Sequence, residues 1–133
     1  MKKFAYLGTG KDITSEKTLL IVEDDANSSE LLVKALRKTN LKLIKVTNGQ
    51  LAIDAVDENP EISIILMDIK MPVMDGLSAA EIIKKKRPDI IIIVQTALIY
   101  FSDRQKANEI GCDDFITKPI IIKEFLDVIR KYL

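Results

Sequence analysis

The chain has 133 residues, of which 47% are hydrophobic and 30% charged, and 20 basic and 20 acidic residues give a formal net charge of zero. This length and composition are typical of one globular domain, and the balanced charge argues against direct nucleic-acid binding as its main role. Because histidine is absent, a Ser-His-Asp triad, a Cys-His dyad and a histidine-ligated zinc site within this chain are excluded.

Cysteine content and hydropathy predict the compartment. The single cysteine, Cys112, has no partner for an intramolecular disulfide, which fits a reducing cytosol. No run of about 18 apolar residues occurs, so membrane insertion is not expected. The start at residues 1–3 is followed by too short an apolar stretch for a signal peptide. We therefore expect a cytoplasmic protein.

Short apolar runs alternate with amphipathic segments from residue 18 onward, whereas residues 1–17 show no periodicity and are interpreted as a tail or linker. The predicted strands cover residues 18–23, 41–46, 62–67, 90–94 and 114–117. The predicted helices lie between Asn27 and Asn40, between Gly49 and Asn59, and over residues 77–86, 103–110 and 122–132. Five strand–helix units in a row predict an α/β domain with a parallel sheet and helices on both faces.

Polar residues at the ends of these elements have simple local interpretations. Asn27 or Ser28 is predicted to cap the first helix. The basic run at residues 84–87 is interpreted as a solvated helix end that favours the helix dipole. Asp113 and Asp114 are expected to begin the last strand and to face solvent.

Carboxylates end two of the predicted strands. Glu23 ends the first strand and is followed by Asp24 and Asp25, and Asp68 follows the third strand. Ligands of open parallel sheets bind outside the carboxyl ends of the strands, so these groups are expected to share one site. Their mutual repulsion would be offset by a hard divalent cation held by oxygen ligands. Asp25 is instead expected to help begin the next helix.

The residue types at the strand ends suit phosphoryl transfer. Asp68 is competent as a nucleophile that forms an acyl phosphate. Mg²⁺ held by Asp24 and Glu23 would neutralise both the nucleophile and the incoming anion. Lys118 and Thr96, after two further strands, could pair with phosphoryl oxygens, the lysine as a point charge. Catalysis of this kind is positioning plus electrostatics.

Four motifs occur in order at the predicted strand ends: Leu-Ile-Val-Glu-Asp-Asp at 20–25, Met-Asp-Ile-Lys-Met-Pro-Val-Met-Asp-Gly at 67–76, Gln-Thr-Ala at 95–97 and Gly-Cys-Asp-Asp-Phe-Ile-Thr-Lys-Pro at 111–119. Together they resemble the receiver domain of bacterial two-component response regulators. The resemblance covers about residues 18–132, so residues 18–133 are assigned to the receiver domain. It implies a CheY-like, flavodoxin-like fold: a doubly wound five-stranded parallel sheet with strand order 2-1-3-4-5.

The resemblance implies a role for each residue at the acidic site. Asp68 corresponds to the phosphoaccepting aspartate. Asp24 corresponds to a direct Mg²⁺ ligand, and Glu23 to an acidic partner that acts largely through water. The backbone carbonyl of Lys70 is the expected third protein ligand. Mg²⁺ is the implied cofactor.

The resemblance also implies a switch. Thr96 corresponds to the hydroxyl that moves toward the phosphoryl group, and Lys118 to the lysine that pairs with it. Phe115 corresponds to the aromatic residue that packs inward when Thr96 moves. The Lys118–Pro119 peptide bond is a candidate for the cis form, because proline makes that form inexpensive.

The implied function is that of a phosphoacceptor in a two-component phosphorelay. A histidine kinase or a histidine phosphotransfer domain would donate the phosphoryl group to Asp68. The modified domain would then bind a downstream protein or output domain, or form a homodimer, through the face of the fourth helix, fifth strand and fifth helix. Such a domain is a signalling module and not an enzyme, although it assists its own phosphorylation and dephosphorylation.

The molecular context and two rival functions remain open at this point. The chain could be a single-domain regulator, a receiver from a hybrid sensor kinase, whose full-length parent could be a histidine kinase, or the N-terminal part of a longer regulator. The alternative function is a Mg²⁺-dependent phosphohydrolase with an aspartyl-phosphate intermediate. Lys70 stands where such an enzyme would carry its second acid, and the chain leaves no room for a cap. A pseudo-receiver acting as a scaffold is the second rival.

Overall fold

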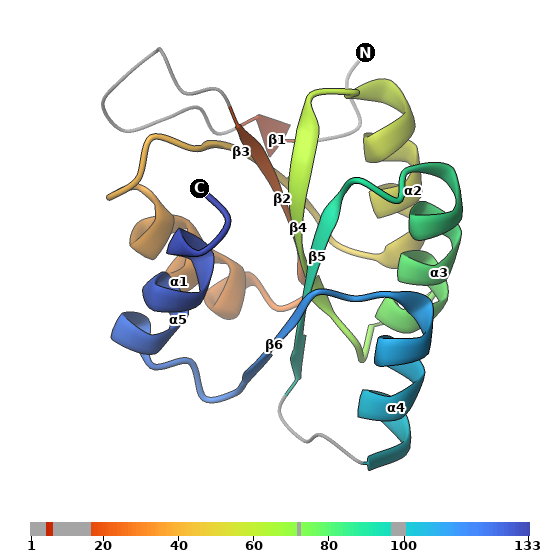
Figure 1. The fold of residues 1–133 in the computed structure, drawn as a ribbon. Coiled ribbons are helices and arrows are strands. Elements are labelled where there is room, and N and C mark those ends of the chain that lie inside the picture. Colours follow the sequence, from red (N-terminus) through yellow and green to blue (C-terminus); the bar gives the residue numbers. More distant parts are fainter. Residues whose placement is uncertain (1–4, 7–16, 72, 97–100) are drawn as a thin grey trace.

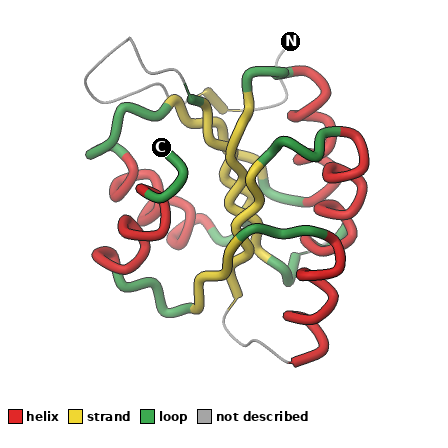
Figure 2. The backbone as a smooth tube through the Cα atoms, in the orientation of Figure 1, coloured by secondary structure: helices red, strands yellow, loops and turns green. Residues whose placement is uncertain are grey.

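The computed structural model describes residues 5–6, 17–71, 73–96 and 101–133. Within these ranges, six strands form one sheet that lies between two layers of helices (Figures 1 and 2). The strands are β1 (Ala5–Tyr6), β2 (Thr18–Val22), β3 (Lys42–Val46), β4 (Ile62–Asp68), β5 (Ile91–Thr96) and β6 (Asp114–Thr117). The helices are α1 (Ala26–Leu36), α2 (Gly49–Glu58), α3 (Gly76–Lys86), α4 (Phe101–Ile110) and α5 (Ile122–Arg130).

The sheet has the order β1-β3-β2-β4-β5-β6. The strands β2 to β6 pair in parallel and correspond to the five strands expected from the sequence, in the order 2-1-3-4-5. The predicted fold class is therefore confirmed. At the edge, β1 pairs with β3 in the antiparallel direction. This strand lies within residues 1–17, whose interpretation as a tail or linker stays a prediction.

The strands are apolar on both faces because helices cover both faces. The helices α1 and α5 lie on one side of the sheet, and α2, α3 and α4 lie on the other (Figure 1). Along β2, Leu20 and Val22 belong to the core under α2 and α3, whereas Leu19 and Ile21 belong to the core under α1 and α5. This burial explains why the sequence shows short continuous apolar runs in place of alternation.

The first helix begins two to three residues earlier than the sequence suggests. Asp25 is the N-cap of α1, and its carboxylate accepts a hydrogen bond of 2.8 Å from the backbone N–H of Ser28. This bond, together with the Ser28 side chain, lowers the pKa of Asp25. The prediction that Asn27 or Ser28 caps the helix is wrong, because both lie inside it. The expected role of Asp25 at the start of the helix is confirmed.

The segment after β4 folds back tightly beneath the end of that strand. The backbone N–H of Gly76 donates to the carbonyl of Ile69 at 2.9 Å. A Cβ atom at Gly76 would collide with the carbonyl oxygen of Asp68, so only glycine fits here. Asp75 then caps α3 by accepting a hydrogen bond from the backbone N–H of Ser78 at 2.9 Å. The position of Asp68 is therefore tied to the start of α3.

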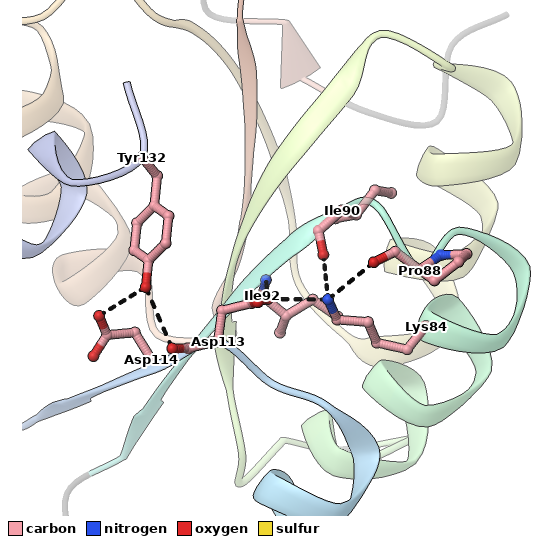
Figure 3. Close-up of polar contacts among 7 residues, drawn as sticks. All are labelled: Lys84, Pro88, Ile90, Ile92, Asp113, Asp114 and Tyr132. Carbon is pink, nitrogen blue, oxygen red and sulfur yellow. Dashed lines mark hydrogen bonds and ion pairs between the residues drawn. The ribbon is translucent and has the colours of Figure 1, made fainter.

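The last turn of α3 is not uniformly solvated. The Lys84 side chain is only 11% exposed, and its ammonium donates to the carbonyl of Ile90 at 2.6 Å and to the carboxylate of Asp113 at 3.0 Å (Figure 3). The prediction of a solvated basic run is wrong for this lysine. It holds for the next two lysines, whose side chains are 77% and 49% exposed.

Asp113 precedes β6 and Asp114 begins it. Their side chains are expected from the sequence to face solvent, but both carboxylates accept hydrogen bonds from other parts of the chain. The Asp113 carboxylate accepts from the backbone N–H of Ile92 at 2.8 Å, in addition to the lysine. The Asp114 carboxylate accepts from the Tyr132 hydroxyl at 3.0 Å and pairs with Lys131 at 3.1 Å. These contacts join the C-terminus of the chain to β6 (Figure 3).

Candidate functional site

Four of the residues singled out by sequence lie at the carboxyl ends of neighbouring parallel strands. Glu23 follows β2, Asp68 ends β4, Thr96 ends β5 and Lys118 follows β6. Because these strands run in the same direction and adjoin in the order β2-β4-β5-β6, their carboxyl ends meet along one edge of the sheet. The topology therefore brings the expected site residues together.

Three carboxylates form a cluster at this edge. Glu23, Asp24 and Asp68 each place one carboxylate oxygen within 4.8 Å of the others. The Glu23 and Asp68 side chains are 1% and 7% exposed, whereas Asp24 is exposed to solvent. Oxygen ligands that converge from buried and solvent-facing sides suit a hard cation that keeps several waters, as Mg²⁺ does. The residues present therefore fit the expected metal.

Lys118 compensates part of this negative charge. Its ammonium lies 2.8 Å from Glu23 Oε1 and 3.5 Å from Asp68 Oδ2, and its side chain is 21% exposed. The three carboxylates of the cluster outnumber this one ammonium. Buried carboxylates without full compensation are costly, so the site favours binding of a further cation.

The pKa shifts at the site follow from burial and from this pairing. Burial raises the pKa of Glu23, and neighbouring Asp68 adds to the rise, against the opposing effect of hydrogen bonds from Lys118 and from the backbone N–H of Asp25. Burial alone would lower the pKa of Lys118, but the hydrogen bond to Glu23 and the attraction of Asp68 outweigh it and raise the pKa. The lysine is therefore held in its charged form beside the carboxylates.

Of the expected switch residues, Thr96 ends β5, the strand that pairs with β4, and Phe115 lies on β6, three residues before Lys118. Thr96 is 2% exposed, and its backbone carbonyl accepts a hydrogen bond of 2.9 Å from the backbone N–H of Lys118. Phe115 is partly buried against the core under α2 and α3. The guanidinium of Arg104, on α4, lies 5.0 Å from the centre of the Phe115 ring. The Lys118–Pro119 peptide bond is cis, as the sequence suggests.

Some expected features are not tested by these contacts. Lys70 lies two residues after Asp68 with an exposed side chain, and the role of its carbonyl as a ligand stays a prediction. Pro72 and Ala97, which belong to the sequence motifs, lie outside the described residues.

Gln95, which the sequence analysis includes only as part of a motif, lies on the strand next to the site. It is fully buried on β5 and is the register partner of Asp68 on β4. Among the described residues, neither the nitrogen nor the oxygen of its side-chain amide has a hydrogen-bond partner. The signal that could have revealed it is an amide in an apolar strand, directly before Thr96.

The fold and the site together define a class, the doubly wound α/β proteins with an acidic site at the carboxyl edge of a five-stranded parallel core. Comparison with known proteins identifies the family. The model of the response regulator receiver domain matches residues 19–130, and the chain belongs to this family. It is accordingly a receiver domain of two-component phosphorelay signalling.

Curated relatives include complete proteins and small parts of long ones. The chain is 30% identical over 119 residues to the polar-differentiation response regulator DivK of Brucella anthropi, covering 88% of this chain and 96% of DivK. It is 34% identical over 129 residues to hybrid signal transduction histidine kinase G of Dictyostelium discoideum. That match covers 90% of this chain but 4% of the kinase, and the chain spans 27% or less of the first four relatives.

Solved structures agree with the fold. A CheY-like receiver domain protein from Methanospirillum hungatei JF-1 is 26% identical with a TM-score of 0.82, covering 88% of this chain and 93% of that one. A second similar structure is the co-crystal structure of the Saccharomyces cerevisiae histidine phosphotransfer protein Ypd1 with the receiver domain of Ssk1. The match has 28% sequence identity and a TM-score of 0.79, and it covers 91% of each chain.

The family is one of signalling domains, and the comparisons lend no specific support to the phosphohydrolase alternative. Receiver domains bind histidine phosphotransfer proteins, as the Ypd1–Ssk1 complex illustrates. Among the described helices, none combines the length and the apolar character that crossing a membrane requires.

Proposed function

We propose that Asp68 accepts a phosphoryl group from the phosphohistidine of a histidine kinase or a histidine phosphotransfer domain. Mg²⁺ would be held by Glu23, Asp24, Asp68 and the backbone carbonyl of Lys70. The observation that carries this proposal is the convergence of three carboxylates within 4.8 Å, with the Lys118 ammonium on two of them. The site thus pairs a nucleophile with positive charge for an incoming anion.

The chemistry is a displacement at phosphorus. An Asp68 oxygen forms a bond to the phosphorus as the phosphorus–nitrogen bond of phosphohistidine breaks, and the imidazole, protonated on its other nitrogen, leaves as a neutral group that keeps the electron pair of the broken bond. A cation held by these residues would supply charge that neutralises the transferred group. Lys118 offers a point charge to one phosphoryl oxygen, and the Thr96 hydroxyl donates to another. The protein contributes position and electrostatics, and the same groups assist hydrolysis of the resulting acyl phosphate.

The proposed output is a change of surface. As Thr96 approaches the phosphoryl group, Phe115 moves inward and the face formed by α4, β6 and α5 changes shape. The phosphoryl group biases an equilibrium that already exists between the two arrangements. A downstream protein, an output domain or a second copy of the chain would read this face. The proposed setting is the cytosol, which the single cysteine supports. The chain is proposed to be a single-domain regulator or a part of a hybrid kinase, since relatives of both kinds match it.

The test is chemical labelling followed by intact mass. Incubation with acetyl phosphate and MgCl₂ should add one phosphoryl group to the wild-type chain and none to Asp68→Asn. The exposed Asp127→Asn on α5 is the matched control and should label like the wild type. Labelling that persists in Asp68→Asn would refute the assignment of Asp68, and omission of Mg²⁺ should slow the reaction strongly.

Two further assays separate the rivals. A phosphohydrolase would turn over p-nitrophenyl phosphate many times per chain, whereas a receiver would not. A pseudo-receiver would bind Mg²⁺ no more tightly than its Asp24→Ala variant. We expect no turnover and a clear loss of Mg²⁺ affinity in Asp24→Ala, because that substitution removes the solvent-facing ligand of the cluster.

A further inference from the structure

The Gln95 side chain is buried at a cost to the fold. It is 0% exposed, and within the described part of the chain neither Nε2 nor Oε1 has a hydrogen-bond partner. A buried amide without partners loses its hydrogen bonds to water and gains none in return. Such groups are rare in folded proteins and point to a role outside packing. Methionine would fill a similar volume without this loss.

The position of Gln95 connects it to the phosphorylation site. In the parallel pair β4–β5 it is the register partner of Asp68, so both side chains leave the sheet on the same face. Ile93, two residues earlier on β5, belongs to the core under α1 and α5. The amide therefore lies on the α1–α5 side of the sheet, one strand away from the proposed phosphoacceptor.

A small cavity links Gln95 to Lys118. It has a volume of about 190 Å³ and lies between α1 and the segment after β6, and both residues line it. Most of the other lining residues are apolar, and Ser28 is the further polar residue. A lysine ammonium carries three hydrogens, and the contacts seen for Lys118 use two acceptors, Glu23 and Asp68. The Gln95 amide offers an acceptor in the same space.

We propose that Gln95 is a positioning residue for phosphoryl transfer, whose amide oxygen accepts a hydrogen bond from Lys118 when Glu23 is engaged by a cation. The inference rests on the function proposed above. Glu23 now holds Lys118 at 2.8 Å, and a second positive charge on this carboxylate would repel the ammonium. The lysine is 21% exposed and needs another acceptor close by. A neutral amide keeps it beside Asp68 without adding negative charge against the incoming phosphoryl group.

The decisive variant is Gln95→Met, with Gln105→Met on the exposed side of α4 as its matched control. We expect Gln95→Met to be as stable as the wild type or more so in urea without Mg²⁺, because an unpaired buried amide is removed. We expect its labelling by acetyl phosphate in MgCl₂ to slow about ten- to a hundredfold, the loss typical of one hydrogen bond to a charged group. Gln105→Met should change neither. Slower labelling together with lower stability would overturn the inference, because the amide would then serve the fold.

A double-mutant cycle tests whether Gln95 acts through Lys118. In a Lys118→Ala background, Gln95→Met should slow labelling no further, since the group that the amide positions is gone. An equal loss in both backgrounds would overturn the proposal. Labelling that is as fast in Gln95→Met as in the wild type would also overturn it. A wild-type chain that is not labelled on Asp68 would instead refute the proposed function itself.

A third measurement does not depend on labelling. The chain has three glutamines, so selective ¹⁵N labelling gives three side-chain amide signals, and Gln95→Met identifies the one of interest. We expect this signal to shift on addition of Mg²⁺ in the wild type and to stay in place in Lys118→Ala. A signal that does not shift on addition of Mg²⁺ in either chain would contradict the proposal. An amide that is hydrogen-bonded only to an internal water would behave in this way.

Discussion

The ammonium of Lys84 lies 3.0 Å from the carboxylate of Asp113, and the same carboxylate oxygen accepts a hydrogen bond of 2.8 Å from the backbone N–H of Ile92 (Figure 3). The lysine also donates to the carbonyl of Ile90 at 2.6 Å. This cluster joins the end of α3 to the start of β5 and to the residue before β6. It lies at the amino ends of β5 and β6, whereas the acidic site lies at the carboxyl ends of the strands. The cluster therefore stabilises the fold without contact with the site.

Lys84→Met should destabilise the protein by about 1–3 kcal/mol, because Asp113 would keep a partly buried charge without its partner and the Ile90 carbonyl would lose its donor. Urea unfolding measures the change. Lys85→Met is the control, since that side chain is 77% exposed and should alter the free energy of unfolding by less than about 0.5 kcal/mol. Equal effects of the two substitutions would contradict the importance of the cluster.

The neighbouring thiol should be unreactive at ordinary pH. Burial raises the pKa of Cys112 from 9.0 to about 11, against the opposing effect of the Lys84 ammonium. Because the thiolate is the nucleophile, alkylation by iodoacetamide should be slow at pH 8 and increase up to about pH 11. Rapid modification of the folded chain at pH 8, with a profile like that of a free cysteine, would contradict this assignment.

The same shift has a consequence for stability. The folded protein binds the Cys112 proton more tightly than the unfolded chain does, since its pKa is raised. The contribution of this group to the free energy of unfolding is therefore fully present below pH 9.0 and is lost as the pH rises through about 11. A Cys112→Ala variant should lack this part of the alkaline loss of stability, which urea unfolding at several pH values would reveal.

The sequence predicts the site well because the chemistry sits at strand ends. Short apolar runs that end in Glu23, Asp68 and Thr96 can be recognised in the sequence alone. Parallel pairing of the strands then brings these three residues together. The helix cap is Asp25, whereas Asn27 or Ser28 is predicted from the sequence. Each of these polar side chains could accept a hydrogen bond from a free backbone N–H at the start of the helix. Local pattern does not choose among them.

Contacts between distant segments escape such reasoning. In the sequence Lys84 is one member of a basic run, and its pairing with Asp113, 29 residues later, cannot be found from the local pattern. The pairing of β1 with β3 joins a two-residue strand to an edge without any periodic signal. Gln95 looks like an ordinary polar residue at a strand end until its burial is known. Each of these features depends on which elements become neighbours.

Gly76→Ala should be much more damaging than Gly111→Ala. A methyl group at Gly76 would collide with the backbone carbonyl of Asp68, so the segment after β4 would have to move. We expect a loss of more than about 2–3 kcal/mol and slower labelling of Asp68. At Gly111 the φ angle is +99° but the space is open, so about 1–2 kcal/mol of backbone strain is expected. Urea unfolding of both variants checks the order, which would be contradicted if Gly111→Ala were the less stable.

The contact between Arg104 and Phe115 should restrain the proposed switch. The guanidinium lies 5.0 Å from the ring centre, a distance at which a cation–π interaction contributes about 0.5–1 kcal/mol near the surface. If inward movement of the ring breaks this contact, Arg104→Gln should raise the population of the inward arrangement about two- to fivefold before phosphorylation. Lys106→Gln, which removes a charge from an exposed position of the same helix, should not.

Fluorine NMR can measure this population directly. The chain has four phenylalanines, so incorporation of 4-fluorophenylalanine gives four signals, and Phe115→Leu identifies the one that matters. The Phe115 signal should lie between its resting and phosphorylated positions in Arg104→Gln and at the resting position in Lys106→Gln. A signal that stays at the resting position in both variants would show that the arginine does not restrain the ring. Equal shifts in both would mean that the net charge of α4, and not the contact with the ring, sets the equilibrium.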